Sequence, residues 1–417
     1  MDREVSAKLE VLFKTKLNSA MRMYLETCAR CGVCVKACHV YNSMPETKYT
    51  AVGRAEVVRK LFRAYFKLEG KIAPWLGETV KLDDVTVDEL YDAAFSCTGC
   101  RRCVTYCPFG IDTQMIMAIA KALVIGADKA PAVLSILSDM SIAKGESIAE
   151  TAVAYEEAIR NLESDVKALW AEPWKPGAPF IPIGVKGADV LYVALSGAHS
   201  IVSAAAIMNA AKENWSLSYF EAVNFGAFLG DAAKAQAIAK RITDEAVRLG
   251  VKEVAIVECG TAFRFMKYMT GRHPFKVSAF VELIDRYVRG GQIKLDDGKI
   301  DGTVTYHDPC QIARNGGVFE EPRNVIAHLT KNYVELKPSR EDNWCCGGGG
   351  GLISMGELDF RMKSSRVKAD QLRSSGAKVV TTACENCHSQ LVDLNEHYGL
   401  GMRVEFLSHI VAKALMA

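Results

Sequence analysis

Two patterns of hydrophobic and polar positions follow one another along the chain. Apolar residues recur every three or four positions through residues 1–17, 53–70 and about 126–170, which predicts amphipathic helices. From residue 186 onward, short β-rich runs alternate with amphipathic stretches, as is typical of parallel βαβ units. The pattern therefore predicts a helical N-terminal part followed by an α/β part.

The α/β part repeats itself. ADVLYVALSG resembles GTVTYHDPCQ, GVKEVAIVECGTAF resembles GAKVVTTACENC, and HPFKVSAFVELIDRYV resembles LGMRVEFLSHIVAKAL. Such internal similarity predicts two copies of one βαβ arrangement. Before the first copy, EPWKPGAPFIPIG (residues 172–184) carries four prolines and is typical of an interdomain linker.

These patterns predict an α+β protein in which a helical domain precedes a duplicated α/β domain with parallel sheets. The predicted segments are a helical domain (1–125), a helical connector with a Pro-rich linker (126–185), a first α/β repeat (186–292) and a second α/β repeat (293–417).

The composition indicates an ordinary folded protein. The chain has 417 residues, 49% of them hydrophobic, and a net charge of +2, which gives no global electrostatic case for nucleic acid. Its first residues lack an apolar core of signal-peptide length, so we expect a cytoplasmic location. The apolar stretch 188–211 contains His199 and three serines, which favours a strand running into a helix over a membrane span. Membrane contact is expected only through a partner.

Eight of the fourteen cysteines lie in two runs, CARCGVCVKAC and CTGCRRCVTYCP, with C-x2-C-x2-C-x3-C spacing. In a cytoplasmic chain, such clustering indicates metal or redox chemistry. Three closely spaced thiolates hold one cubane iron–sulfur cluster, while the fourth reaches the other cluster of a two-cluster domain. The spacing predicts two [4Fe-4S] clusters that together conduct one electron at a time. One is expected on Cys28, Cys31, Cys34 and Cys107, and the other on Cys97, Cys100, Cys103 and Cys38.

Zinc is the alternative metal, although its sites rarely use the closely spaced third and fourth cysteines. Cys38 is followed by His39, where Pro108 follows Cys107, a departure that does not affect ligation. Arg101 and Arg102 are interpreted as a solvated basic face. Alternatively, they could steer an acidic redox partner or raise the reduction potential of the cluster.

The second repeat is rich in cysteine and the first is depleted. The second contains Cys310, Cys345, Cys346, Cys384 and Cys387. The aligned positions in the first are Ser196, Asn224, Phe225, Cys259 and Ala262. The five cysteines lie at or after the ends of predicted strands, where open α/β sheets bind their ligands, so we expect them to converge on one metal site. The first repeat is expected to be structural, with Cys259 as a buried relic.

The stretch WCCGGGGGL (residues 344–352) places five glycines after two of these cysteines. Without Cβ atoms, the glycines let the main chain approach a bulky inorganic core, and their N–H groups can point at its sulfides. Gly347, Gly348 and Gly349 are therefore candidate cofactor-binding residues. A P-loop is excluded because no Lys-Ser/Thr pair follows. Zinc bound by four of the five cysteines is the main rival, and unrelated buried cysteines are the other.

HDPC, WCCGGGGG and ACENC resemble the elements of the cysteine-rich CCG domain. Joined to the two-cluster region, they resemble the D-type catalytic subunit of heterodisulfide reductase and its DsrK-type relatives over most of the chain. This resemblance implies that the five cysteines hold a non-cubane four-iron cluster at which a sulfur–sulfur bond is cleaved.

The depleted first repeat departs from the methanogen enzyme, which has two full cysteine sets, and favours the DsrK-like branch. That branch implies a small sulfur-carrier protein with a disulfide or trisulfide as the substrate. It also implies a haem-bearing, cytochrome b-type membrane subunit as the electron donor, which would attach the chain to the inner face of the cytoplasmic membrane.

Reducing a disulfide takes two electrons that cubanes deliver singly, so a half-reduced sulfur species must be held between deliveries. His307 and His388, near Cys310 and Cys387, are candidate proton donors, and each is equally explained as a structural histidine. Two other functions fit the sequence. One is an electron-relay subunit of a flavoprotein dehydrogenase complex, of the glycerol-3-phosphate or glycolate oxidising type, and the other is a zinc-bearing assembly scaffold.

Overall fold

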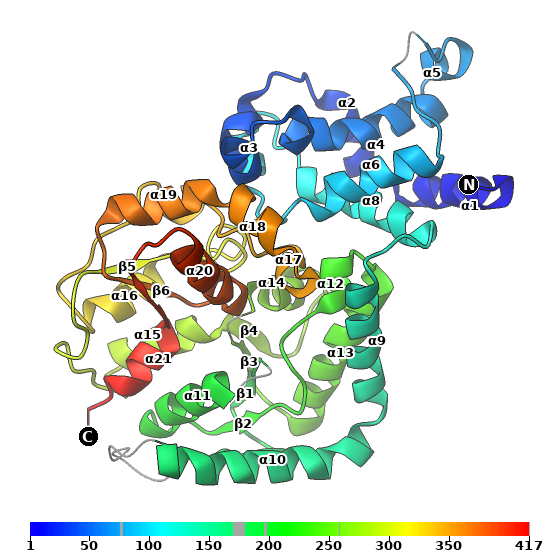
Figure 1. Ribbon diagram of the computed structural model, residues 1–417. Coiled ribbons are helices and arrows are strands. Elements are labelled where there is room, and N and C mark those ends of the chain that lie inside the picture. Colours follow the sequence, from blue (N-terminus) through cyan, green and yellow to red (C-terminus); the bar gives the residue numbers. More distant parts are fainter. Residues whose placement is uncertain (76–77, 170–179, 196–197, 258, 417) are drawn as a thin grey trace. The chain divides into compact units, whose positions relative to one another are not determined.

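The computed structural model describes residues 1–75, 78–169, 180–195, 198–257 and 259–416 (Figure 1). The chain divides into two compact units. The N-terminal unit comprises Met1–Ile136, Phe228–Ala232 and Trp344–Lys368, and the C-terminal unit comprises the rest of the described chain. Residues 170–179, which include most of the Pro-rich linker, lie outside the described residues. So does Ser196, which aligns with Cys310.

The N-terminal unit is helical, as the periodicity predicts. Its α-helices are α1 (Arg3–Lys16), α2 (Ser19–Thr27), α3 (His39–Ser43), α4 (Ala51–Phe66), α5 (Leu68–Ile72), α6 (Asp84–Phe95), α7 (Arg102–Tyr106), α8 (Thr113–Gly126), α17 (Leu352–Met355) and α18 (Leu358–Ser364). Two short 3-10 helices, η1 (Val33–Ala37) and η2 (Thr47–Tyr49), lie among them.

Helices α4, α6 and α8 form the core of this unit, with α6 and α8 packed side by side (Figure 1). Helix α4 begins where the Thr50 side chain accepts a hydrogen bond from the Gly53 N–H, and it buries Ala55, Val58 and Phe62 on one face. Helix α8 is capped in the same way by Asp112. These caps place the N-termini of α4 and α8 next to the two cysteine runs.

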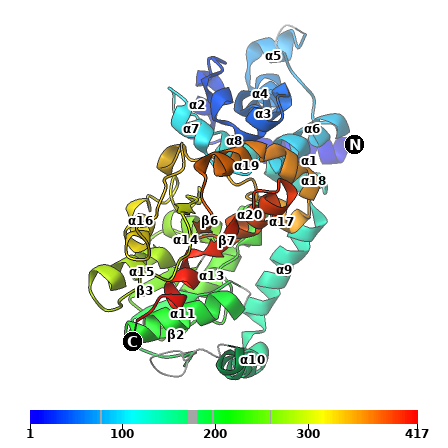
Figure 2. The same ribbon diagram turned by 60° about the vertical axis from the view of Figure 1, so that its left-hand side comes forward.

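A segment from the second predicted repeat completes the N-terminal unit. Helix α18 packs against α3 in both views (Figures 1 and 2). The rings of Tyr49 and Phe360 are 5.9 Å apart, and the Val367 N–H donates to Ser43 Oγ at 3.1 Å. Residues 344–368 therefore share a core with the cysteine runs, although the sequence places them inside an α/β repeat.

The C-terminal unit contains two parallel sheets. The first has the strand order β2-β1-β3-β4 and the second has the order β5-β6-β7. The strands are β1 (Val190–Val193), β2 (Trp215–Leu217), β3 (Glu253–Ile256), β4 (Lys276–Ala279), β5 (Val304–Tyr306), β6 (Val379–Thr382) and β7 (Arg403–Phe406). All residues of β1, β2, β5 and β6 are buried, as expected for parallel strands covered on both faces.

Helices connect the strands, as βαβ units require. Those of the C-terminal unit are α10 (Ile148–Leu169), α11 (Ala198–Ala210), α13 (Ala232–Leu249), α14 (Gly260–Tyr268), α15 (Phe280–Arg289), α16 (Glu320–Ala327), α20 (Glu385–His397) and α21 (Leu407–Lys413), with the short η3 (Arg340–Asp342). The helices α9 (Ala132–Glu146), α12 (Phe225–Leu229) and α19 (Arg366–Ser375) contain residues of both units, and the first residue of α13, Ala232, belongs to the N-terminal unit.

The two sheets show the predicted duplication. Strands β1, β3 and β4 follow one another in the same order and direction as β5, β6 and β7. Even the extra strand β2 has a counterpart, because Val304 of β5 forms a parallel bridge with Tyr333. The predicted fold class is confirmed: a helical region and duplicated α/β repeats with parallel sheets.

Candidate iron–sulfur sites

The first cysteine group gathers thiols from both cysteine runs. Cys28 ends α2, Cys34 lies in η1 and Cys107 ends α7, while Cys31 is exposed. Burial raises the pKa of the Cys34 thiol, and the nearby thiols of Cys107, Cys28 and Cys31 raise it further. The Val52 N–H donates to the same sulfur. The structure thus groups these four sulfurs in the crossed arrangement.

The second group has the complementary composition. Burial raises the pKa of the Cys103 thiol well above its ordinary value, and the neighbouring thiols of Cys100, Cys97 and Cys38 add to the effect. Together with Thr98, Gly99 and Gln114, the four cysteines line a small cavity of about 30 Å³. The fourth cysteine of each run therefore joins the first three of the other run.

Both runs reach this arrangement through the same backbone turn. Arg30 and Gly32 flank the middle cysteine of the first run, with φ of 53° and 79°. Gly99 and Arg101 flank the middle cysteine of the second, with φ of 66° and 59°. Two left-handed residues around one cysteine curl the chain so that three thiols face one centre, and only glycine takes this conformation without strain.

The donor sets fit cubane iron–sulfur clusters. Each group offers four sulfurs, the soft ligands that such clusters use, from the spacing typical of them. Backbone N–H groups also point at the sulfurs, from Val52 to Cys34 and from Gly99 to Cys97. These contacts stabilise negative charge on the thiolates, as a bound cluster requires.

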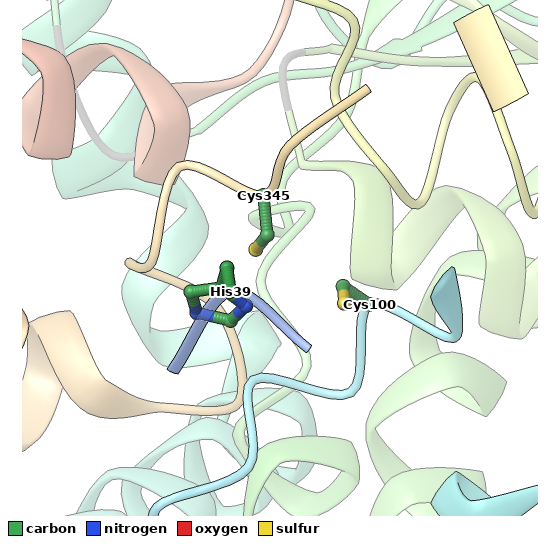
Figure 3. Close-up of side chains that lie close together, drawn as sticks. All are labelled: His39, Cys100 and Cys345. Carbon is green, nitrogen blue, oxygen red and sulfur yellow. The ribbon is translucent and has the colours of Figure 1, made fainter. Parts of the chain in front are cut away.

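One cysteine of the second repeat lies beside the second group. In the N-terminal unit, Cys345, Cys100 and His39 bring one sulfur or nitrogen atom each to within 4.8 Å of one another (Figure 3). Cys345 makes the largest contribution to raising the pKa of Cys100 to about 11, with burial adding to it and His39 opposing it. His39 is only 2% exposed, and neither of its ring nitrogens has a hydrogen-bond partner among the described residues. No pattern in the sequence predicted this contact.

The glycine run has two roles. The Gly347 N–H donates to Cys345 Sγ and the Gly348 N–H donates to Cys346 Sγ, both at 3.4 Å. The next glycines instead pack against the second cysteine run. A Cβ atom on Gly349 would stand 2.8 Å from the Thr98 carbonyl oxygen, and one on Gly350 would stand 2.6 Å from that of Cys97. Close packing against the backbone of the second cysteine run is therefore a structural reason for glycine at these two positions.

Three further candidate cysteines lie in the C-terminal unit. Cys310 follows β5, while Cys384 and Cys387 follow β6, its parallel neighbour. Strand ends in parallel sheets meet at one edge, so these residues lie where the sequence predicts them. The thiol of Cys387 lowers the pKa of Cys384 by hydrogen bonding, burial opposes this, and the Gly260 N–H lowers it further. Cys345 and Cys346, in contrast, belong to the N-terminal unit.

The depleted repeat also contributes to this edge. Cys259 is buried at the start of α14, and burial raises the pKa of its thiol to about 12 with a further increase from Cys384. The residue after it supplies the Gly260 N–H to Cys384. The two cysteines that align between the repeats are therefore spatial neighbours, and the first repeat supports the second through its backbone.

The two candidate proton donors occupy different surroundings. His307 is fully buried, with its Nδ1 3.2 Å from Asn343 Nδ2. His388 stacks on Phe406 with ring centroids 3.9 Å apart, and burial lowers its pKa. The structure adds His199, whose Nε2 lies 3.1 Å from a carboxylate oxygen of Glu385. His199 was visible in the sequence as a polar interruption of an apolar stretch, but nothing linked it to Glu385.

The interpretation of Arg102 as part of a solvated face is wrong. Its side chain is 3% exposed and its guanidinium lies 3.7 Å above the centre of the Trp344 ring. It also donates to the Ala37 carbonyl at 3.0 Å. Arg101 forms an ion pair with Asp112 at 2.8 Å. Both arginines hold the turns of the N-terminal unit together.

Comparison with known families agrees with both parts of this site. A 4Fe-4S dicluster domain matches residues 24–111, which include both cysteine runs. A cysteine-rich domain, CCG, matches residues 304–392, which include all five cysteines of the second repeat.

Relatives cover nearly the whole chain. A protein named Hdr-like menaquinol oxidoreductase iron-sulfur subunit 2, from Archaeoglobus fulgidus, is 27% identical over 96% of this chain and 81% of its own. The D-type subunit of dihydromethanophenazine:CoB–CoM heterodisulfide reductase from Methanosarcina barkeri is 27% identical over 96% of both chains. The chain resembles heterodisulfide reductase iron–sulfur subunits over most of its length. The predicted resemblance is thereby confirmed, as is the assignment to iron–sulfur oxidoreductases. Both relatives are named as subunits, which implies that they act together with partner subunits.

A third relative, EtfAB:quinone oxidoreductase from Syntrophomonas wolfei, is 22% identical over 88% of this chain and 55% of its own. Among the described residues, no helix has both the length and the apolar character needed to cross a membrane.

Proposed function

We propose that this chain passes single electrons through two cubane clusters to a third, non-cubane cluster at which a disulfide or trisulfide is reduced. The observation that carries the proposal is the contact of Cys345 with Cys100 in one compact unit. It joins a ligand candidate of the cysteine-rich domain to a ligand candidate of the dicluster domain. An electron leaving the second cysteine group therefore has a direct path to the residues of the cysteine-rich domain.

The proposed ligands of the third cluster are the five cysteines that the matched cysteine-rich domain contains: Cys310, Cys345, Cys346, Cys384 and Cys387. When bound, the clusters would supply one-electron chemistry and soft sites for sulfur. The chain's own contribution is to hold and stabilise thiolates. The Gly347, Gly348 and Gly260 N–H groups donate to three of the five, and zinc held by four of the five is the alternative.

Burial of the proposed cluster ligands also supports the proposed reduction. Cys345, Cys346, Cys384 and Cys387 are each at most 8% exposed. A site that excludes water protects a half-reduced sulfur species between two electron deliveries. His307 and His388 are kept as the proposed proton donors because His307 directly follows β5, three residues before Cys310, and His388 lies in α20 next to Cys387.

For substrate and partners, we propose the DsrK-like arrangement. The substrate would be a disulfide or trisulfide on a small sulfur-carrier protein. The electron donor would be a haem-bearing, cytochrome b-type membrane subunit that holds the chain at the inner face of the cytoplasmic membrane. The menaquinol oxidoreductase relative supports a quinol-linked donor, and the heterodisulfide reductase relative supports a sulfur–sulfur bond as the acceptor.

The test is a single-turnover reaction of the anaerobically purified and chemically reduced protein with protein and low-molecular disulfides. We expect thiol release at a rate that exceeds the background, and about twelve iron atoms per chain for three four-iron clusters. Cys387→Ser should abolish thiol release while the signals of the two cubanes remain. About eight iron atoms, with zinc in the remaining site, would contradict the proposal and favour an assembly scaffold.

The second candidate is an electron-relay subunit of a flavoprotein dehydrogenase complex with no substrate of its own. The EtfAB:quinone oxidoreductase relative favours it, because that name joins a flavoprotein to quinone. The same experiment separates the two functions. A relay would exchange electrons with a quinone or a reduced flavoprotein and would release no thiol from any disulfide.

A further inference from the structure

A buried arginine contacts the second cysteine group. Arg54, on α4, is 2% exposed. Its Nη1 donates to Cys38 Sγ at 3.4 Å and to the Tyr49 carbonyl oxygen at 2.6 Å. Its Nε and Nη2 donate to the hydroxyl and carbonyl oxygens of Ser96 at 3.3 and 3.2 Å. Four contacts therefore fix the guanidinium against a proposed cluster ligand.

The charge of Arg54 is not balanced by a carboxylate among the described residues, since its partners are a thiol, a hydroxyl and two carbonyl groups. Of these partners, only the Cys38 thiol readily ionises to a negative charge. The compensating negative charge for this arginine is thus the second cysteine group itself.

A second buried basic side chain lies near Cys97. Lys121, on α8, is 8% exposed, and its Nζ donates to the Phe228 carbonyl oxygen. The same Nζ donates to the carbonyl oxygen of Gly350 at 3.5 Å, and Gly350 packs against the Cys97 backbone. Two helices of the core, α4 and α8, therefore each place a basic side chain near this cysteine group.

The arginines beside the first cysteine group are paired with carboxylates. Arg30, inside the first run, pairs with Glu56 at 2.7 Å and Glu78 at 2.8 Å. Arg63 pairs with the same two glutamates, and the buried Arg59 pairs with Glu56. Three arginines and two glutamates leave a net charge of +1, but Arg30 and Glu78 are exposed, so solvent screens this charge more than it screens that of the buried Arg54.

We propose that Arg54, assisted by Lys121, gives the cluster on Cys38, Cys97, Cys100 and Cys103 a higher reduction potential than the other cubane. Reduction adds a negative charge, which a nearby buried cation stabilises, and an N–H···S hydrogen bond withdraws charge from the sulfur. Electrons would then be drawn from the cluster on the first cysteine group towards the one that adjoins Cys345. This inference deepens the proposed function and rests on it for the role of that second cluster.

The test is a redox titration followed by electron paramagnetic resonance on the anaerobically purified full chain. Cys38→Ser assigns one of the two cubane signals to the second group, because it replaces a ligand of that cluster alone. In the wild-type protein, the assigned cluster should be reduced first. Arg54→Met should lower its midpoint potential and leave the other cluster unchanged, and Arg54→Lys should restore most of the difference because it keeps the charge.

Arg59→Met is the matched control, since Arg59 is equally buried but paired with Glu56. It should leave the potential of the second cluster unchanged. Lys121→Met is an independent variant that should move that potential in the same direction as Arg54→Met. If Arg54→Met fails to retain iron, the wild-type order of reduction and Lys121→Met still decide the question.

The proposal is overturned if the second cluster is reduced after the first, or if Arg54→Met and Lys121→Met leave its potential unchanged. Equal shifts of both cubanes would also overturn it, because they would indicate a general loosening of the unit. These readouts need no disulfide substrate. A chain that fails to release thiol but shows the expected potentials would refute the proposed function and leave the role of Arg54 intact.

Discussion

The sulfur atoms of Cys100 and Cys345 lie within 4.8 Å of each other in the N-terminal unit, although the two residues belong to separate motifs far apart in the sequence. Thr98 adds a second contact, because its Oγ1 lies 3.5 Å from Cys345 Sγ. The motif of the cysteine-rich domain is thereby anchored on the backbone of the dicluster domain. Changes in this packing should affect both motifs together.

The close approach of the glycine run gives the first prediction. Gly350 and Gly356 have similar positive φ values, 69° and 74°, but a Cβ atom on Gly350 would meet the Cys97 carbonyl oxygen at 2.6 Å, whereas one on Gly356 would meet nothing within 4 Å. Gly356→Ala should therefore cost only the left-handed conformation, about 1 kcal/mol. Gly350→Ala should cost about 1–3 kcal/mol more. Urea unfolding of the iron-loaded protein measures the difference, and equal losses would contradict the packing role.

A buried ion pair beside Cys310 gives the second prediction. Arg323 bonds to Asp308 at 2.8 Å and to Glu335 at 2.7 Å, and the Asp308 side chain is 1% exposed. Arg323→Met leaves Asp308 buried without its countercharge, which should cost about 3–5 kcal/mol of unfolding free energy. Lys240→Met removes an exposed pair with Asp244 and should have no measurable effect. Chemical unfolding followed by circular dichroism compares the two variants, and a loss from Arg323→Met no greater than that from Lys240→Met would count against the pair.

The pH dependence of stability gives the third prediction. Burial, with smaller contributions from His199 and Lys413, lowers the pKa of His409 to about 4, whereas an unfolded histidine titrates near 6.5. Between these values the unfolded chain binds a proton that the folded chain does not, so stability is lost as the pH falls from about 6.5 to about 4. His409→Gln should reduce this loss. Unfolding free energies at pH 7 and pH 5 test it, with the exposed His328→Gln as the control that should keep the wild-type loss.

Removal of iron gives the fourth prediction. The thiols of Cys97 and Cys103 are half-buried, and burial raises the pKa of both. Because metal binding contributes to folding free energy, chelation should loosen α4 and α8 far more than the sheet strands β1 and β3. Hydrogen exchange before and after anaerobic chelation measures this. Equal increases in exchange rate in the sheet would show that the clusters do not selectively stabilise the helical unit.

Local sequence patterns predicted the fold class well. The three-and-four periodicity gave α1, α4 and the helical connector, and the repeated β-rich runs gave two parallel sheets with matching strand order. The cysteine spacing also gave the grouping of the eight thiols, since two left-handed residues around each middle cysteine fold three sulfurs towards one centre. Such features depend on neighbours within a few residues, which the sequence displays directly.

These local patterns did not predict the long-range contacts. The sequence placed residues 344–368 in an α/β repeat and Arg102 at the surface, whereas the structure packs both into the helical unit. It also gave no sign that Arg54 reaches Cys38, or that His199 of the depleted repeat reaches Glu385. In each case the partners are brought together by core packing, and no period or motif records which distant segments share a core.

The sequence by itself determined the chemistry available to this protein: thirteen grouped cysteines, a glycine run and two α/β repeats, of which one kept its sulfurs. Only the tertiary structure decided how that chemistry is connected, by placing Cys345 against Cys100 and the guanidinium of Arg54 against Cys38. The reason is physical. Residue type and spacing set what a side chain can bind, whereas the electrostatic surroundings of a buried sulfur depend on which distant segments pack around it.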